Sequence, residues 1–157
     1  MNLPQVTALA GSSFGGCTNL TYVNLPKVTT INGGVLSNSK LTSLYLPSLT
    51  TITGWSWNFN HSGRLKRVYF PKLTGTITNR DFINCNVLDT LILGYTGGVC
   101  SLSDIEAFNN TPIASGTGYI YVPKALVESY KTAENWSTYA SQIRAIEDYP
   151  EILEGWE

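Results

Sequence analysis

The chain has 157 residues, enough for one domain with its own buried core. Charged residues make up 13% of it, about half the usual share, so neutral polar side chains must cover much of the surface. No apolar run approaches the length of a membrane-spanning helix, and the segment after Met1 lacks the charged and apolar regions of a signal peptide. We therefore expect no membrane insertion and no cleaved leader: the chain is either used without secretion or excised from something larger.

Charges are distributed unevenly along the chain. Seven basic and no acidic residues precede Asp81, whereas eleven acidic and three basic residues occur from that position onward. In a repeat protein, order in the sequence becomes position along the molecular axis, so we expect a basic end and an acidic end. Two interpretations stay open: drift in the composition of the repeats with an acidic, solubilising end, or a dipole that serves the function.

The predicted elements along most of the chain are short strands that each end at a similar dipeptide, Leu-Pro or a close variant. Its copies are spaced by 22, 21, 24, 23 and 29 residues, at Leu3-Pro4, Leu25-Pro26, Leu46-Pro47, Phe70-Pro71, Leu93-Gly94 and Val122-Pro123. Spacing this regular indicates a repeat architecture in which each copy is one structural unit.

Within each repeat the strand follows a Leu-x-x-Leu-x-Leu pattern, as in Leu41, Leu44 and Leu46. The last three positions alternate in, out and in, so stacked copies form a parallel sheet with apolar residues inside. Two further columns precede the leucines, one filling the opposite wall and one at the turn: Phe14, Val35, Phe59 and Phe82, then Cys17, Asn38, Ser62 and Cys85. Residues 28–31 predict a second extended segment rather than a helix.

These units resemble the BspA-type leucine-rich repeats of bacteria, which read roughly Ala-Phe-x-Gly-Cys-x-x-Leu-x-x-Ile-x-Leu-Pro. Residues 13–20 (Ser-Phe-Gly-Gly-Cys-Thr-Asn-Leu) match closely, residues 81–88 match partly, and the middle repeats depart at the cysteine. The resemblance implies a β-rich leucine-rich-repeat solenoid over residues 1–123, with about five coils and parallel strands on the concave face. Members of the family are mostly surface or adhesion proteins, and their repeats carry no fixed ligand.

After Pro123 the pattern changes to helical periodicity, and Trp136-Ser137 marks a break between two short helices. We expect residues 124–146 to form a C-terminal helical cap over the edge of the last coil, similar to the closing module of such proteins. Residues 147–157 form an acidic tail that is either loosely held or docked through Ile152 and Trp156. The N-terminus enters the repeat directly, which favours truncation or attachment to an upstream domain or partner subunit.

Residues that could carry catalysis or bind a metal are sparse. His61 is the single histidine, and no nucleophile motif or zinc-type spacing accompanies it, so we interpret it as a surface-loop residue. Cys17 and Cys85 are expected to be buried thiols. The three cysteines do not form a disulfide framework. The sequence therefore predicts neither an enzyme, nor a cofactor, nor a metal site.

Two sets of residues are candidates for binding a partner. The first is a tyrosine-rich strip with one arginine on the concave face: Tyr22, Tyr45, Tyr69, Tyr121 and Arg67. Tyrosine offers rigid amphipathic area for recognition, but it is also simply a good strand residue, and both interpretations stay open. The second set centres on Trp55 and Trp57 beside basic residues of the third coil. Alternation predicts that one of these two tryptophans faces inward.

Two functional hypotheses follow from these features. The leading one is a non-catalytic recognition or adhesion module, surface or phage-encoded, that binds a protein or glycan through the concave face. The alternative is a purely structural repeat module of a larger surface protein or virion. Nucleic acid is a less suitable partner because the basic set is small and faces an acidic half. The oligomeric state does not follow from the sequence.

Overall fold

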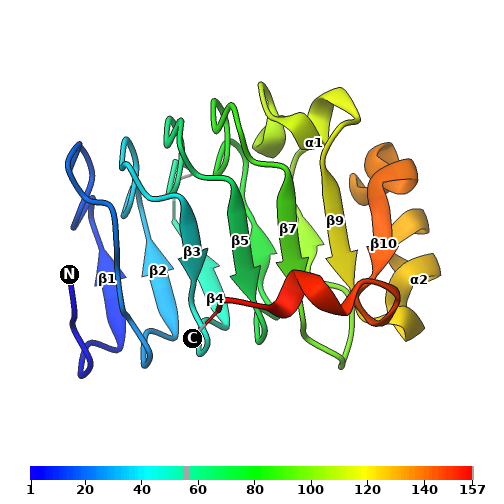
Figure 1. Cartoon of the computed structure of the whole chain (residues 1–157), viewed down its shortest axis with the longest axis horizontal. Helices are drawn as coiled ribbons and strands as arrows, with labels where there is room; N and C mark the ends of the chain where they lie inside the picture. The colour runs from blue at the N-terminus through cyan, green and yellow to red at the C-terminus, as the bar shows by residue number, and fades with distance from the viewer. Residues whose placement is uncertain (55–56, 157) are drawn as a thin grey trace.

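The computed structural model describes residues 1–54 and 57–156 of the chain. Successive repeats stack side by side along the long axis, so strands distant in sequence become neighbours (Figure 1). All pairs of named strands in the described part are parallel. This agrees with the parallel sheet predicted from the leucine pattern.

The main sheet has the strand order β10-β9-β7-β5-β3. Its strands are β3 (Ser43–Tyr45), β5 (Arg67–Phe70), β7 (Thr90–Leu93), β9 (Tyr119–Val122) and β10 (Ile143–Ala145). Leu44, Val68, Leu91 and Ile120 occupy equivalent positions in register and are almost fully buried. They form the continuous apolar row that the in-out alternation predicts.

Two further parallel sheets carry the second extended segment of the repeats. They are β1 (Ala8–Ala10), β2 (Thr30–Asn32) and β4 (Thr51–Thr53) in one, and β6 (Thr76–Ile77) and β8 (Ser101–Leu102) in the other. Threonine hydroxyls link successive repeats there: Thr50 Oγ1 donates to the carbonyl of Thr29 at 3.2 Å, and Thr74 Oγ1 to that of Thr50 at 3.3 Å. The extended segment predicted around residues 28–31 is thus present as β2.

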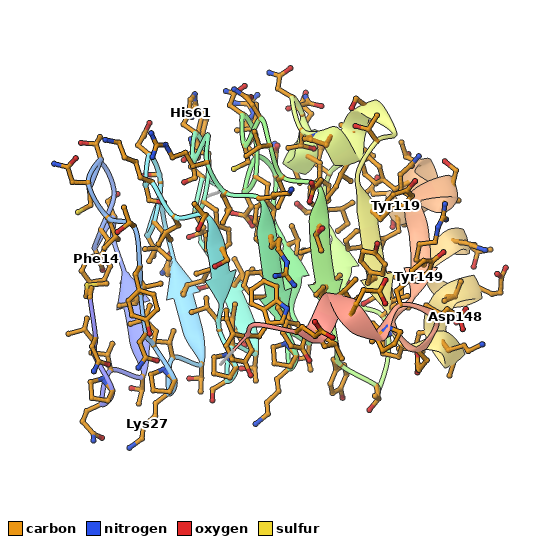
Figure 2. The ribbon with its side chains drawn as sticks, in the orientation of Figure 1. Phe14, Lys27, His61, Tyr119, Asp148 and Tyr149 are labelled. Atoms are coloured by element: carbon orange, nitrogen blue, oxygen red, sulfur yellow. The ribbon has the colours of Figure 1, made fainter. Side chains whose placement is uncertain are left out.

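One turn of the repeat requires a left-handed backbone, which asparagine tolerates better than most residues. Asn38, His61, Asn84 and Asn110 all have φ between 55° and 62°. Their side chains form a ladder, because Asn110 Nδ2 donates to Asn84 Oδ1 at 2.6 Å and Asn84 Nδ2 lies 2.9 Å from His61 Nε2. His61 is therefore exposed at a turn, as predicted, and Figure 2 places it at the edge opposite Lys27.

A column of stacked phenylalanines lies in the segments that connect the second extended segment of each repeat to the next strand of the main sheet. The ring centroids of Phe59 and Phe82 lie 5.0 Å apart, and those of Phe82 and Phe108 lie 5.6 Å apart. All three rings are within 1% of complete burial. Their stacking extends the apolar core from repeat to repeat.

The second repeat departs from the predicted columns by one residue. In this repeat Leu36 occupies the phenylalanine column and Ser39 occupies the turn column, where the sequence predicted Val35 and Asn38. The amide of Leu36 donates to the carbonyl of Asn58, and the amide of Ser39 donates to Ser62 Oγ, at 2.8 and 3.3 Å. This repeat is one residue shorter between the turn and the next leucine, so an alignment without a gap slips by one position.

Burial of the repeat columns differs between the first repeat and the later ones. Cys85 is fully buried, as predicted, whereas Cys17 in the equivalent position is exposed, which corrects the prediction of a buried thiol. Phe14 is likewise half-buried. Within the described chain the first repeat packs against a neighbour on one side, and this explains the difference.

Short helices and turns follow β8, and more helical segments follow β9. They are η1 (Ile105–Phe108), α1 (Pro112–Ser115), η2 (Lys124–Leu126), α2 (Val127–Thr132) and η3 (Trp136–Gln142), where η marks a 3-10 helix. Trp136 Nε1 donates to the carbonyl of Cys100 at 2.7 Å, and the amide of Cys100 donates to Tyr130 Oη at 3.1 Å. The backbone of one residue, Cys100, thus anchors both halves of the helical region.

The segment predicted as two capping helices contains a strand as well. Residues 124–142 are largely helical, but β10 follows them and pairs with β9, with Ile143 opposite Ile120. The main sheet therefore extends one strand beyond the predicted last coil. Helical periodicity dominated residues 124–142, and a three-residue strand was too short to recognise there.

The tail, residues 146–156, is docked rather than loosely held. It contains η4 (Ile146–Asp148) and η5 (Pro150–Leu153), and it runs back across the front of the main sheet toward β3 (Figure 1, red). The tail brings Glu154 next to Arg67, in the basic half of the molecule. The separation into a basic and an acidic end is consequently weaker than the sequence order predicts.

Candidate functional site

The candidate site is the outer face of the main sheet, meaning the outward side chains of its strands. One row along this face runs Tyr45, Tyr69, Ile92 and Tyr121, and a neighbouring row runs Ser43, Arg67, Thr90 and Tyr119. This register is the one predicted for the tyrosine-rich strip. The parallel pairing therefore brings Tyr45, Tyr69 and Arg67 together on two adjacent strands.

The tyrosines of β3 and β5 form an aromatic platform for Trp156 of the tail. Tyr45 and Tyr69 stack with ring centroids 5.3 Å apart and planes 17° from parallel. The Trp156 ring lies 6.0 Å from Tyr45 and 5.7 Å from Tyr69. Trp156 is 8% exposed as a result. Burial of an indole of this size is among the larger apolar contributions that one side chain makes.

Arg67 on β5 contacts the tail through its planar guanidinium. Its Cζ lies 4.5 Å from the centroid of the Trp156 ring, a cation-π geometry. Its Nη2 donates to the carbonyl of Ile152 at 2.7 Å and to the carbonyl of Glu154 at 3.3 Å. Arg67 thus recognises the backbone of the tail and an aromatic side chain at the same time.

A small apolar cluster fixes the middle of the tail. Ile152 packs with Ile92, Tyr121 and Trp156, all at most 9% exposed. The ring of Tyr149 meets that of Tyr121 edge-on, at a centroid distance of 5.6 Å. Figure 2 shows Tyr149 where the tail leaves the region of β10. The residues predicted as a dock, Ile152 and Trp156, are the ones that contact the sheet.

Polar contacts fix the start of the tail. Lys124 Nζ pairs with Asp148 Oδ1 at 2.7 Å, and the amide of Lys124 donates to Glu147 Oε2 at 2.8 Å. Both side chains of this ion pair are more than half exposed, so the pair contributes little to the stability of the fold. Near the other end Gly155 has φ +76°, which turns Trp156 back toward the sheet.

Burial raises the pKa of two tyrosine hydroxyls on the outer face. Desolvation raises the pKa of Tyr69, with a further contribution from Tyr45. Desolvation likewise raises the pKa of Tyr121, with smaller contributions from Tyr149 and Glu151. Both hydroxyls therefore titrate further above neutral pH than an ordinary tyrosine does, and they form neutral aromatic surface.

The outer face is open beyond the end of the tail, over the first repeats. Tyr22 is 59% exposed there. A hollow of about 260 Å³ lies beside it, lined by Tyr22, Val23, Asn24, Pro26, Ser43, Tyr45, Pro47, Gly155 and Trp156. Four of the five predicted strip residues thus touch or closely neighbour the tail, whereas Tyr22 faces open surface.

The second predicted set does not form a single surface. Trp55 lies outside the described residues. Trp57 is 39% exposed and stacks under Arg80, whose Cζ is 5.4 Å from the ring centroid, so it points outward and partners a residue that the prediction did not include. Asn58 and Asn60, which follow Trp57 in the sequence, are buried. Asn58 instead hydrogen-bonds the buried Asp81.

None of the helices in residues 1–54 and 57–156 is long and apolar enough to cross a bilayer. Within the same ranges, no group of three or more His, Cys, Asp or Glu side chains is arranged to hold a metal ion.

Sequence reasoning did not place the tail in the site. Trp156 and Ile152 were recognised as apolar residues of an acidic segment, but their docking position was not predicted. The available signal was their spacing: two large apolar residues four positions apart in a segment otherwise rich in acids. Such spacing places both side chains on one side of a helical turn.

The repeat geometry and the comparison with known families agree. A model of the BspA type leucine rich repeat region matches residues 1–114 in six copies. The chain belongs to this family. BspA-type leucine-rich repeats are typically protein-interaction or adhesion modules. Comparisons with curated proteins and with solved structures find no match.

Proposed function

We propose that this BspA-type repeat chain is a non-catalytic recognition module, a solenoid of about five coils that binds a protein partner through the outer face of the main sheet. The observation that supports this most is the docked tail. The face already holds a peptide segment, through tilted aromatic contacts and a cation-π contact with Trp156 and hydrogen bonds from Arg67 to backbone carbonyls. Aromatic anchors and arginine are the residues that dominate binding energy at protein interfaces.

A polypeptide suits this surface better than a glycan. Stacked tyrosines accept either a sugar ring or an apolar side chain, but the guanidinium of Arg67 is directed at peptide carbonyls. The open hollow beside Tyr22 extends the same face, so a partner has room to bind next to the tail. We therefore place the first contact of the partner at Tyr22, Asn24 and Ser43.

The absence of catalysis is part of the proposal. Both ring nitrogens of His61 lie 2.9 Å from a side-chain amide nitrogen, of Asn60 and of Asn84, which fits a structural role in the turn ladder. Burial raises the pKa of the Cys85 and Cys100 thiols to about 12, so neither is a thiolate nucleophile at neutral pH. These observations support a binding role over an enzymatic one.

A purely structural module is the second candidate, and one observation favours it. The tail covers the central part of the outer face, as a chain without an external ligand would seal its own apolar surface. Under this alternative the aromatic strip completes the fold and has no partner.

A selection experiment separates the two candidates. Displayed random-peptide libraries are panned against the native full-length chain, and enriched peptides are titrated against Tyr22→Ala and, as a matched control, Tyr95→Ala in the turn after β7. The proposal predicts at least about a tenfold loss of affinity for Tyr22→Ala and no change for Tyr95→Ala. Equal binding by both variants contradicts the proposed face, and no enrichment above background supports the structural alternative.

A further inference from the structure

The tail shows what kind of ligand the outer face fits. Its contacts use an aliphatic residue, a tryptophan four positions later and the carbonyls between them, rather than any feature unique to this chain. We infer that the partner presents the same short turn within an acidic segment, and that the tail is a resident competitor for its site. This inference rests on the proposed function and specifies its ligand.

The geometry of the tail explains why the spacing matters. The 3-10 helix η5 and the left-handed Gly155 fold the segment so that Trp156 Nε1 donates to the carbonyl of Ile152 at 2.8 Å. Both side chains then face the sheet, at 9% and 8% exposure, whereas Leu153 between them is 39% exposed. A ligand with its apolar residue and tryptophan at another spacing cannot fill both positions at once.

The carbonyl oxygen of Ile152 accepts two hydrogen bonds in this arrangement. It accepts from Trp156 Nε1 within the tail and from Arg67 Nη2 on β5. The same guanidinium covers the indole, at 4.5 Å from the ring centroid. A lysine at this position keeps the charge but loses the planar stacking surface and the forked donors, so Arg67 selects for the turn and the indole together.

Charge favours an acidic ligand. The tail carries Glu147, Asp148, Glu151 and Glu154, and its C-terminal end reaches β5 and β3, which lie in the part of the chain that has no acidic residue before Asp81. An acidic segment that approaches the first repeats therefore meets a surface of opposite charge, which accelerates association. This complementarity distinguishes the expected ligand from a neutral or basic peptide.

The tail is held in a way that permits displacement. Its main contacts with the sheet are the side chains of Tyr149, Ile152 and Trp156 and the hydrogen bonds from Arg67, and its two helical turns are too short to be stable alone. Because it is tethered, it competes at a high effective concentration, and an external ligand binds in proportion to the fraction of open molecules. Loosening the tail must therefore raise the affinity for a ligand of the same chemistry.

The test uses full-length chains and a labelled synthetic peptide of residues 146–156 as the probe. Trp156→Ala releases the tail, and Ile152→Ala does so by an independent change. Each variant is expected to bind the peptide at least about tenfold more tightly than the native chain does. Leu153→Ala, at an exposed position of the same turn, is the matched control and should behave as the native chain. Adding Arg67→Lys to Trp156→Ala should abolish the gain.

Several results would overturn the inference. One is equal peptide affinity for the native chain and both tail variants, with circular dichroism showing that the variants are folded. Another is equal binding of a peptide in which the tryptophan is replaced by alanine. A concentration-dependent dimer of the native chain that Trp156→Ala abolishes would assign the tail to a second copy instead. Peptides that bind through Tyr22 but do not compete with the tail peptide would refute this inference and leave the proposed function intact.

Discussion

The buried carboxylate of Asp81 makes a sharp test of how the repeats are held together. Its side chain is fully buried, and two donors point at each oxygen. Asn58 donates to Oδ1 from its amide at 3.2 Å and from Nδ2 at 2.7 Å. Thr78 donates to Oδ2 from its amide at 2.7 Å and from Oγ1 at 2.8 Å. Asp81→Asn keeps the shape of the side chain and replaces one of these acceptor oxygens with a donor.

The cost of this substitution follows from counting partners. If the new amide nitrogen faces Asn58, two donors lose their acceptor. If it faces Thr78, the hydroxyl rotates to accept, and the backbone N–H of Thr78 is left without a partner. The second arrangement costs less, and one buried unpaired N–H lowers stability by about 2 kcal/mol. For a chain of this size the melting temperature should fall by about 6 °C.

The pH dependence of this difference has a defined sign. Burial raises the pKa of Asp81 above its ordinary value, against the four hydrogen bonds that lower it. The native chain thus retains the proton over a range above pH 3.8 in which the unfolded chain has lost it. Its stability falls as pH rises through that range, whereas the asparagine variant has no such titration. The native chain should be more stable than Asp81→Asn by about 2 kcal/mol near pH 4, and this difference should narrow toward pH 7.

Urea denaturation followed by circular dichroism at pH 4, 5, 6 and 7 measures this gap. Asp89→Asn is the control, because Asp89 is partly exposed and its 3.5 Å pair with Lys66 is worth at most about 0.5 kcal/mol. Two results would refute the reasoning. One is an Asp81→Asn variant that is as stable as the native chain at pH 4. The other is a difference in stability that widens as pH rises, which would show that the hydrogen bonds outweigh desolvation.

Three further predictions concern the turn ladder, the phenylalanine column and the thiols. His61→Asn should leave stability unchanged or raise it by up to about 0.5 kcal/mol, because asparagine tolerates the φ of 55° and continues the amide ladder. Phe82→Ala should lower stability by about 4 kcal/mol, since the ring is fully buried between two others. Ellman's reagent should modify Cys17 at once in the native chain, and Cys85 and Cys100 after unfolding. Because burial raises the pKa of the latter two from 9.0 to about 12, stability should fall above pH 9 by up to about 1.4 kcal/mol per pH unit for each thiol.

Each of these has a result that would contradict it. A loss above about 1 kcal/mol in His61→Asn would show that the imidazole is needed where an amide was expected to suffice. A Phe82→Ala variant within about 1 kcal/mol of the native chain would mean that the column collapses around the gap. Rapid modification of three thiols, or a flat stability profile between pH 9 and 11, would refute the burial of Cys85 and Cys100.

The repeat core follows from local sequence because its positions are set by alternation. Leu44, Val68, Leu91 and Ile120 line up as predicted, since in a parallel sheet a shift by one residue would turn every apolar side chain outward. The same rule fixed the outward partners Tyr45 and Tyr69. Family membership agrees with the motif at residues 13–20.

The features that the sequence did not determine share a physical origin, because they depend on neighbouring parts of the chain rather than on the repeat. The slip to Leu36 reflects a one-residue deletion that periodicity alone does not locate. Positions 17 and 85 both carry cysteine, but the exposure of each thiol depends on what packs beside its repeat. The docking of Trp156 depends on a platform that assembles from strands about 90 to 110 residues earlier in the chain. Long-range packing of this kind leaves little trace in a single sequence.

The outer face of the main sheet is proposed to recognise a partner, and the contacts that now hold the tail are inferred to be those that the partner uses. The most direct measurement follows the indole N–H of Trp156 by heteronuclear NMR while a selected peptide ligand is titrated into the native full-length chain. In the present state this proton is bonded to the carbonyl of Ile152 at 2.8 Å. Ligand binding should move this resonance toward that of an unbound indole and shift the amides of Tyr45, Arg67 and Tyr69. A ligand that binds while the Trp156 signal and these amides stay unchanged would contradict this inference.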